Sequence, residues 1–324
     1  MQQSSEHIST FNIAFYNLEN LFDTHNDSNT LDDDFTPNSI KRWNKKRFQK
    51  KVKKLGEVIS NIGFNEIGYP PVIIGVAEVE NRAVLEALVN SNYLIKKGYE
   101  IVHFDSPDER GIDTGLLYRK DFFTVEHKET FTLMLKNEFG VRDFTRDILY
   151  VKGSLEGEPL HVLVNHWPSR RAGAEETAYK RIAAAIKNKE IVDEIASKDP
   201  AAKILVMGDF NDDPHSESIK ELTLSSLYNP MEVLLTNYSG STNYRGAWNL
   251  FDQILLSHNF LQQYGNSFRF DAARIFNPKE ITEFRGRSKG NPFRTFIGRK
   301  YLGGFSDHFP VYGTFSIHNK QNRI

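Results

Sequence analysis

An apolar run that ends in a cluster of acidic residues constrains the fold of this chain most. Residues 204–207 (Ile-Leu-Val-Met) form a short continuous apolar run, which is typical of a strand buried on both faces. Gly208 then allows close backbone approach, and residues 209–213 (Asp-Phe-Asn-Asp-Asp) precede the turn residue Pro214. Such a strand brings carboxylates to the rim of a sheet, where a metal or phosphate can bind. The alternative is an Asx-rich turn that caps the next helix.

The same pattern recurs along the whole chain. Phe11, Ile13 and Phe15 alternate as in a strand, and an apolar run at 72–77 predicts a second buried strand. Each of these strands, and three more, has polar residues at one end: Asn17 and Glu19, Glu78, Asn165 and His166 after Val162–Val164, Asp252 before Ile254–Leu256, and Asp307 and His308 before Val311. If these residues form one site, both ends of the chain belong to one domain.

The remaining segments predict further strands, two long helices and one long loop. Short strands are expected at 100–104, 115–119, 122–126 and 147–152, a helix capped by Asn81, and a long helix at 174–197. Residues 41–59 predict an amphipathic helix whose basic face, between Lys41 and Lys54, is either solvated or a patch for phosphates or a membrane surface. Residues 285–304, rich in glycine and arginine, predict a loop.

Length and composition limit the classes of protein. The 324 residues suit one large α/β domain at 11–318, with tails at 1–10 and 319–324. A net charge of −1 gives no overall attraction to nucleic acid, and the absence of cysteine excludes disulfides and thiolate sites. No apolar run approaches the ~20 residues of a membrane span. We expect a monomer, cytoplasmic as the sequence stands, or secreted or in the cell envelope if a leader precedes Met1.

The polar residues at the strand ends match the needs of phosphoester hydrolysis. Carboxylates such as Glu19, Glu78, Asp209 and Asp307 are hard oxygen ligands that suit Mg²⁺ or Mn²⁺. Histidines titrate near neutrality, and Asp252 could fix the tautomer of one of them. The donors expected for phosphate oxygens are Asn17, Asn211, Arg119 and Arg170. Each residue alone is more often an ordinary histidine or a turn residue, but their shared placement indicates a metal-assisted phosphoester hydrolase.

These segments also resemble a known family. The chain is similar to the endonuclease/exonuclease/phosphatase superfamily, which includes deoxyribonuclease I, apurinic endonucleases, sphingomyelinases and inositol polyphosphate phosphatases. The matching segments span nearly the whole chain in the family's order: Tyr16-Asn17-Leu18-Glu19-Asn20, Val76-Ala77-Glu78-Val79-Glu80, Asn165-His166-Trp167, Gly208-Asp209-Phe210-Asn211, Phe251-Asp252-Gln253-Ile254 and Ser306-Asp307-His308. A bacterial branch of the superfamily is similar at 145–149, 165–171 and 301–308.

The resemblance implies a four-layered α/β sandwich, with two mixed sheets face to face and helices outside. It implies that Glu78, helped by Glu19, Asn17 and Asp307, holds Mg²⁺ or Mn²⁺. Asp209 with Asn211 would activate a water, while His166 and His308, the latter oriented by Asp252, would stabilise the phosphoryl oxygens. Glu19 departs from the apurinic endonucleases, which usually carry Asp, and no counterpart of their DNA-intercalating loops is found.

Three functions remain open from the sequence. A nuclease would use the basic helix and the cluster Arg285, Arg287, Lys289, Arg294 and Arg299, with Trp167 and Phe293 as stacking residues and Arg119 and Arg170 on phosphates. A phosphatase or phosphodiesterase acting on a small phosphate ester or lipid head group would need only the site and a pocket. A non-catalytic binding module is disfavoured, because acids and histidines are intact at every matching position. The nuclease is favoured modestly.

Overall fold

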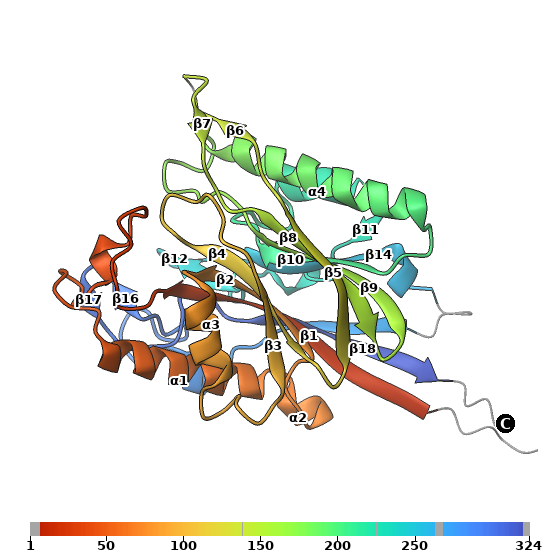
Figure 1. Cartoon of the computed structure of the whole chain (residues 1–324), viewed down its shortest axis with the longest axis horizontal. Coiled ribbons are helices and arrows are strands. Elements are labelled where there is room, and N and C mark those ends of the chain that lie inside the picture. The colour runs from red at the N-terminus through yellow and green to blue at the C-terminus, as the bar shows by residue number, and fades with distance from the viewer. Residues whose placement is uncertain (1–6, 138, 225, 263–267, 320–324) are drawn as a thin grey trace, which may run out of the picture.

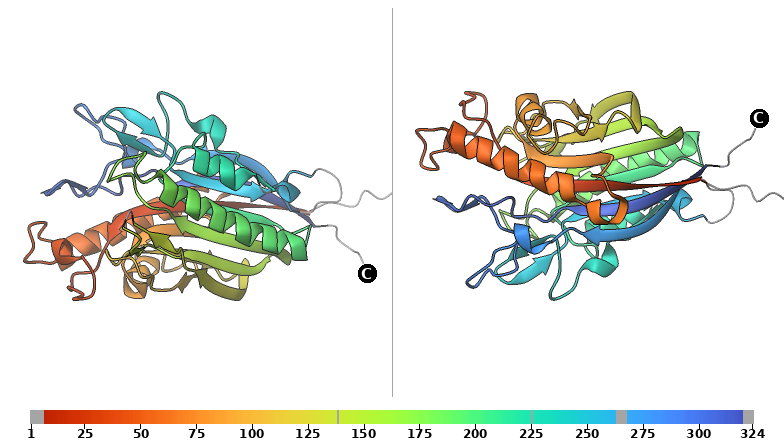
Figure 2. Two further views of the ribbon diagram at one scale, coloured as in Figure 1. Left: turned by 90° about the horizontal axis from the view of Figure 1, so that it is seen from above. Right: turned by 90° about the horizontal axis from the view of Figure 1, so that it is seen from below.

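Two six-stranded mixed sheets pack face to face, with helices on both outer faces (Figure 1, Figure 2). The computed structural model describes residues 7–319, apart from residues 138, 225 and 263–267. A large apolar cluster fills the space between the sheets and includes Phe15, Val164 and Met207. Two further clusters lie between each sheet and its helices. The predicted four-layered α/β sandwich is confirmed.

The first sheet holds both ends of the described chain. Its central strand β1 runs parallel to β2 and antiparallel to the last strand β18. In spatial order its strands are β15 (Phe268–Ile275), β18 (Val311–Asn319), β1 (His7–Leu21), β2 (Ile73–Val79), β4 (Asp113–Arg119) and β3 (Tyr99–His103). Because β1 begins at His7, residues 7–10 belong to the sheet and not to the predicted tail. Residues 1–6 and 320–324 of the two predicted tails lie outside the described residues.

The second sheet contains the buried strand that ends in Asp209. Its order is β11 (Leu227–Tyr228), β14 (Asp252–Ser257), β10 (Ile204–Asp209), β9 (Glu158–His166), β8 (Ile148–Leu155) and β5 (Phe123–Phe131). Every residue of β10 is buried, as its apolar run predicts. A Cβ at Gly208 would lie 2.4 Å from the carbonyl oxygen of Asn165, so the close pairing of β10 with β9 requires glycine there.

Helices cover the outer face of each sheet. On the first sheet lie α1 (Lys45–Asn61), the short α2 (Phe64–Ile67) and α3 (Arg82–Val89); on the second lie α4 (Ala178–Lys198) and α5 (Glu217–Thr223). Helix α1 begins at Lys45 and not at Lys41, because the Asn44 side chain accepts the N–H of Arg47 as its N-cap. Asn81 caps α3 as predicted, by accepting the N–H of Val84.

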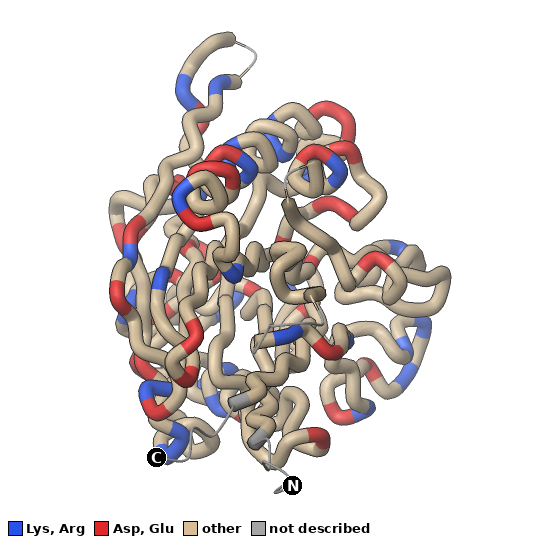
Figure 3. The backbone as a smooth tube through the Cα atoms, turned by 90° about the vertical axis from the view of Figure 1, so that its right-hand side faces the viewer, with Lys and Arg blue, Asp and Glu red and all other residues tan. Residues whose placement is uncertain are grey.

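Short elements that lack a hydrophobic period complete the chain. Three two-stranded hairpins are β6 (Leu135–Lys136) with β7 (Arg142–Asp143), β12 (Thr242–Tyr244) with β13 (Ala247–Asn249), and β16 (Phe296–Ile297) with β17 (Lys300–Tyr301). The 3-10 helices are η1 (Asp33–Phe35), η2 (Glu232–Leu234), η3 (His258–Phe260) and η4 (Lys279–Ile281). The predicted loop 285–304 therefore contains the β16–β17 hairpin. Basic and acidic residues are interspersed along the backbone (Figure 3).

The topology brings strand ends from both sheets together. The parallel pairs β1–β2 and β9–β10 all finish at one end of the sandwich, and Asp209 pairs in register with His166 on β9 and Asp252 on β14. Left-handed backbone at four non-glycine residues marks this end: Glu19, Asn20, Glu78 and Asn211 have φ of 50°, 52°, 60° and 51°. Such strain clusters at functional sites, where surrounding contacts maintain it.

Within the described part of the chain, no helix is both long enough and apolar enough to span a membrane.

Candidate active site

Asp209 lies at the centre of the strand ends and is 2% exposed. Its Oδ2 accepts a hydrogen bond from Asn17 Nδ2 at 2.9 Å, and its Oδ1 accepts the backbone N–H of Asn211 at 2.9 Å. Burial raises the pKa of Asp209 to about 6, with a further rise from Asp252 and an opposing effect from His308. The carboxylate is therefore a base whose pKa lies near neutrality.

His308 is held beside Asp209 by a buried carboxylate. Its Nδ1 donates to Asp252 Oδ2 at 2.6 Å, and its Nε2 lies 3.9 Å from Asp209 Oδ2. Burial alone would lower the pKa of His308, but the charges of Asp252 and Asp209 outweigh burial and raise this pKa well above its usual value. His308 is therefore a charged imidazolium at neutral pH.

His166 approaches the same oxygen of Asp209 as His308 does, but its pKa is shifted in the opposite direction. Its Nε2 lies 3.8 Å from Asp209 Oδ2 and 3.9 Å from Glu78 Oε1. Burial, followed by the positive charges of Arg146 and Arg110, lowers the pKa of His166 well below its usual value. A neutral and a charged histidine thus lie within 3.9 Å of one oxygen of Asp209. Environments that drive pKa values apart in this way are typical of acid–base sites.

Glu78 offers the best-placed oxygen for a divalent cation. Its Oε2 accepts the backbone N–H of Asn20 at 2.8 Å, while its Oε1 faces His166 beyond hydrogen-bond distance. The side chain is 15% exposed, so solvent reaches it. Mg²⁺ is usually held by one or two carboxylates together with waters and substrate phosphates. The residues at this edge fit such a cation. We name Glu78, Asp209, Asp252, His166 and His308 the Asp209 cluster.

The structure does not leave Glu19 free to bind the same cation. Its Oε2 accepts the N–H of Thr295 at 2.6 Å and lies 3.4 Å from Lys51 Nζ, and its Oε1 accepts the N–H of Phe296 at 3.3 Å. The Lys51 side chain is only 1% exposed. The predicted ligand is therefore part of a buried ion pair that fastens β1 to α1 and to the segment before β16.

Asn17 and Asp307, the other two predicted ligands, are also engaged by protein groups. Asn17 uses both ends of its amide, since Oδ1 accepts the N–H of Glu19 at 2.9 Å and Nδ2 donates to Asp209. Asp307 forms an ion pair with Arg294. Burial alone would raise the pKa of Asp307, but His308 and Arg294 lower it. Asn17 thus positions Asp209, and Asp307 lies at the rim of the site with 28% of its side chain exposed.

Three residues predicted to contact the substrate, the phosphate donors Arg119 and Arg170 and the stacking residue Trp167, lie elsewhere or are occupied by protein groups. Arg119 is at the far end of β4, where its backbone N–H bonds to Val72 and its Nε to the Lys97 carbonyl. Trp167 is 2% exposed and packs edge-to-face on Phe210. The structure therefore does not bring these two residues to the Asp209 cluster, because antiparallel β4 runs away from the site and because the indole is a core group.

Arg170 lies near the site, but its guanidinium is bonded to other protein groups. Its Nη2 lies 2.6 Å from Asp212 Oδ1, its Nε donates to the Asn211 carbonyl at 2.7 Å, and its guanidinium stacks on Phe251. The arginine fixes the loop that follows Asp209. Asn211 is fixed from the other side as well, since its Nδ2 donates to the Trp167 carbonyl at 3.0 Å.

A family model for the endonuclease/exonuclease/phosphatase family matches residues 12–317. The chain belongs to this family. A search of curated protein sequences finds no significant match. At the level of the family, the chain is a hydrolase that acts on phosphoester bonds with a divalent metal.

Solved structures of low sequence identity share the fold. An endonuclease/exonuclease/phosphatase family protein from Bacteroides thetaiotaomicron has a TM-score of 0.58 at 16% identity, covering 96% of this chain and 99% of that one. Humanized D. rerio TDP2 has a TM-score of 0.58 at 15% identity, with 94% and 98% covered. D. rerio TDP2 complexed with a single-strand DNA product has a TM-score of 0.56 at 16% identity, with 95% and 99% covered.

Two arginines that were given no role from the sequence support the part of the site that contains His166 and Glu78. Arg146 donates to the carbonyls of His166 and Trp167 at 3.1 and 2.7 Å and pairs with Asp108 at 2.9 Å. Arg110 donates to Asn20 Oδ1 at 2.9 Å, next to the N–H that holds Glu78. Neither follows a buried apolar run, so the pattern that located the acids could not locate them. The signal in the sequence that includes Arg146 is the segment 145–149, which resembles the bacterial branch.

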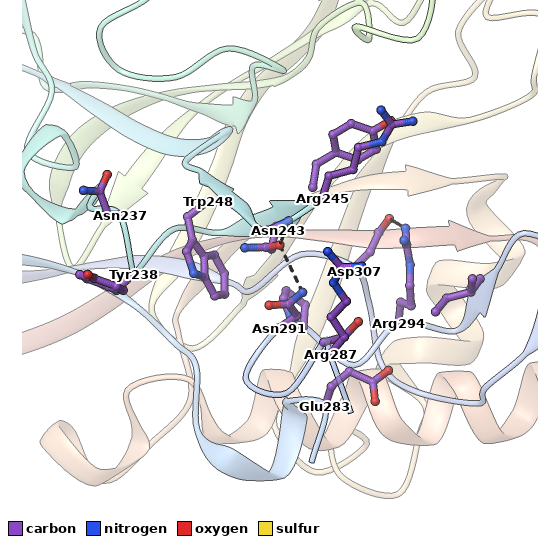
Figure 4. Close-up of a pocket in the computed structure, with 15 residues that line it drawn as sticks. Asn237, Tyr238, Asn243, Arg245, Trp248, Glu283, Arg287, Asn291, Arg294 and Asp307 are labelled. Atoms are coloured by element: carbon purple, nitrogen blue, oxygen red, sulfur yellow. Dashed lines mark hydrogen bonds and ion pairs between the residues drawn. The ribbon is translucent and has the colours of Figure 1, made fainter. Parts of the chain in front are cut away.

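A wide groove of about 850 Å³ opens beside Asp307 (Figure 4). Its lining combines aromatic and basic side chains, with few acids: Tyr238, Tyr244, Trp248, Arg245, Arg287, Arg294, Glu283 and Asp307 are among them. Tyr238 and Tyr244 are 88% and 65% exposed. We call this the aromatic groove. Of the predicted loop cluster, Arg287 and Arg294 line it, and the predicted stacking residue Phe293 packs instead against Lys54 and Phe305.

Proposed function

We propose that the protein is a nuclease, a divalent-metal-dependent hydrolase that cleaves phosphodiester bonds by in-line attack of water. The observation that supports the proposal is the placement of neutral His166 and charged His308 within 3.9 Å of Asp209 Oδ2, with Glu78 3.9 Å from His166. A base, an acid and a cation-binding oxygen thus meet at one point, as metal-assisted phosphoester hydrolysis requires.

Each side chain has a distinct part in the proposed reaction. Asp209 orients a water opposite the leaving group and takes its proton, and a pKa of about 6 leaves it mostly ionised at neutral pH. His308, kept charged by Asp252, stabilises the phosphoryl oxygens and donates a proton to the leaving oxygen. His166, as a neutral imidazole, donates a hydrogen bond to a phosphoryl oxygen. Glu78 would hold the cation, which would neutralise charge that develops on the phosphate.

The aromatic groove favours a nucleic acid over a small ester as the substrate. Single-stranded nucleic acids bind where bases stack on aromatic rings and cations follow the backbone. Exposed Tyr238 and Tyr244 provide the rings, and Arg245 and Arg287 provide the cations next to the Asp209 cluster. The TDP2 structure with a single-strand DNA product gives the same indication for a protein of similar fold.

The proposal is tested by a screen for metal-dependent activity. Single-stranded DNA, plasmid DNA, RNA, sphingomyelin and inositol phosphates are each incubated with Mg²⁺ or Mn²⁺, and with EDTA as the control. We expect cleavage of a nucleic acid that EDTA abolishes. Release of phosphate or a head group from a small ester, without nucleic-acid cleavage, would favour a phosphatase or phosphodiesterase. Hydrolysis that persists fully in EDTA would contradict the proposed chemistry.

A further inference from the structure

A second, smaller cavity lies on the His166 side of the Asp209 cluster. It has a volume of about 190 Å³ and is lined by residues directly after β9, by residues directly before β8, and by the start of α4. Polar and basic side chains in its lining include Thr145, Arg146, Ser169, Arg171 and Lys180. Room for several waters at ~30 Å³ each is enough for a hydrated oxyanion. We call it the Arg171 cavity.

The charge around this cavity is mostly positive and incompletely neutralised. Arg146 is paired with Asp108, and Lys180 is paired with Asp143, the carboxylate in the lining. Arg171 has no carboxylate within ion-pair distance among the described residues, and its side chain is exposed. Burial lowers the pKa of Lys41 and of Arg110, and the positive charge of Arg171 lowers both further. The three like charges therefore repel one another. Like charges gathered in this way are stabilised by an anion.

One residue of the same lining carries a buried hydroxyl without a partner. Thr145 is 5% exposed, and its Oγ1 has no hydrogen-bond partner among the described residues. A buried hydroxyl without a partner costs free energy, so a ligand that accepts from it is favoured. The Ser169 side chain and Thr177, just before α4, complete a polar wall. The positive end of the α4 dipole adds to the attraction of this wall for an anion.

We propose that the Arg171 cavity binds a second phosphate group of the substrate, next to the phosphate that is cleaved. The inference rests on the proposed function, since it takes the scissile phosphate to lie in the Asp209 cluster. Arg171 is the main contact, and the buried Thr145 Oγ1 would reach the phosphate once its side chain turns toward the cavity. The substrate then extends from the aromatic groove, across the Asp209 cluster, into the Arg171 cavity. The second phosphate is either the neighbouring linkage of a nucleic-acid strand or another phosphate on a small molecule.

The first test pairs a change in the enzyme with a change in the substrate. Trinucleotides carry an uncharged methylphosphonate at the linkage next to the scissile one, and kcat/KM is measured for wild type and for Arg171→Gln. We expect the neutral linkage to lower kcat/KM about 10- to 100-fold in the wild type, as the loss of a hydrogen bond to a charged group does. In Arg171→Gln the neutral linkage has little further effect. Additive losses would overturn the proposal.

A control variant and a second substrate pair identify the source of the phosphate. Arg274→Gln removes an arginine of β15 whose partner is Glu66. In this control the neutral linkage should lower kcat/KM by the same factor as in the wild type. Small esters with one or two phosphates form the second pair. A preference for two phosphates that needs Arg171, without any effect of methylphosphonate, would assign the cavity to small molecules. An equal loss on all substrates, including those with one phosphate, would place Arg171 on the scissile phosphate and overturn the proposal.

A binding measurement separates this inference from the proposed function. Inorganic pyrophosphate is titrated into the whole chain in EDTA and followed by calorimetry. We expect Thr145→Val and Arg171→Gln each to weaken binding about 10-fold or more, while Arg274→Gln binds as the wild type does. This result can hold even if no nucleic acid is cleaved, in which case the nuclease proposal fails alone. Pyrophosphate binding that none of the variants alters would overturn the second phosphate site.

Discussion

Replacement of Lys51 by Met should destabilise the protein more than any exposed lysine of the same helix would. Lys51 Nζ donates to the Glu19 carbonyl at 2.9 Å and to Thr295 Oγ1 at 2.5 Å, and it lies 3.4 Å from the Glu19 carboxylate. Both side chains are at least 94% buried, so solvent screens little of this interaction. Methionine keeps the apolar stem but leaves the Glu19 carboxylate without its cation.

The expected loss is about 3–5 kcal/mol of unfolding free energy, the range for removing one partner of a buried ion pair. Thermal unfolding should shift down by roughly 6–10 °C, at about 2 °C per kcal/mol for a chain of this size. Burial already raises the pKa of Glu19 against the effect of Lys51. A raised pKa favours the folded state at low pH and disfavours it as pH rises through that pKa. The loss should therefore be larger at pH 8 than at pH 5.

Two companion variants make this result interpretable. Lys53→Met changes an exposed lysine of α1 and should alter stability by no more than about 0.5 kcal/mol. Adding Glu19→Gln to Lys51→Met should restore part of the loss, because the amide oxygen still accepts from Thr295 but carries no charge. If Lys51→Met were as mild as Lys53→Met, the buried ion pair would not hold β1 to α1.

Three further predictions concern the chemistry. Asp252→Asn removes a charge that raises the pKa of His308. The alkaline limb of the pH–kcat/KM profile should therefore move to lower pH, and kcat should fall about 10²–10⁴-fold. An alkaline limb that does not move would exclude His308 as the acid. Since Asp209 acts as a carboxylate with a pKa of about 6, kcat/KM should decline as pH drops through that value, and a flat profile down to pH 4 would contradict its role as base. Glu78→Gln should raise the Mg²⁺ concentration needed for half-maximal activity at least ~10-fold with an unchanged melting temperature, whereas an unchanged Mg²⁺ requirement would exclude Glu78 as a ligand.

The resemblance of the sequence segments to the family predicted the sandwich, and the strand-end pattern predicted that the residues of the Asp209 cluster lie at strand ends. Asp209, His166 and Glu78 each end a buried apolar run, and parallel strands that end together place such residues at one edge. The pattern does not give side-chain direction or long-range partners. Glu19 departs from the expected role because its partner Lys51 is 32 residues away and the N–H of Thr295 is 276 residues away.

Strand direction and burial explain where the other residues lie. Arg119 shares a strand with Asp113, but β4 is antiparallel to β2, so its seven residues carry Arg119 to the opposite end of the sheet. The hairpins and Arg146 have no apolar period, so the sequence pattern could not reveal them. Their positions depend on tertiary contacts, such as the bonds from Arg146 to two carbonyls next to the site.

The central claim is that Asp209 and His308 act as one catalytic unit on a phosphodiester. The most direct measurement is the Mg²⁺-dependent kcat for cleavage of a single-stranded oligonucleotide by wild type, Asp209→Asn, His308→Ala and the double variant. Residues that act together give losses that do not multiply. The account predicts that the double variant is slower than the worse single variant by less than about 10-fold. Losses that multiply in the double variant would contradict it.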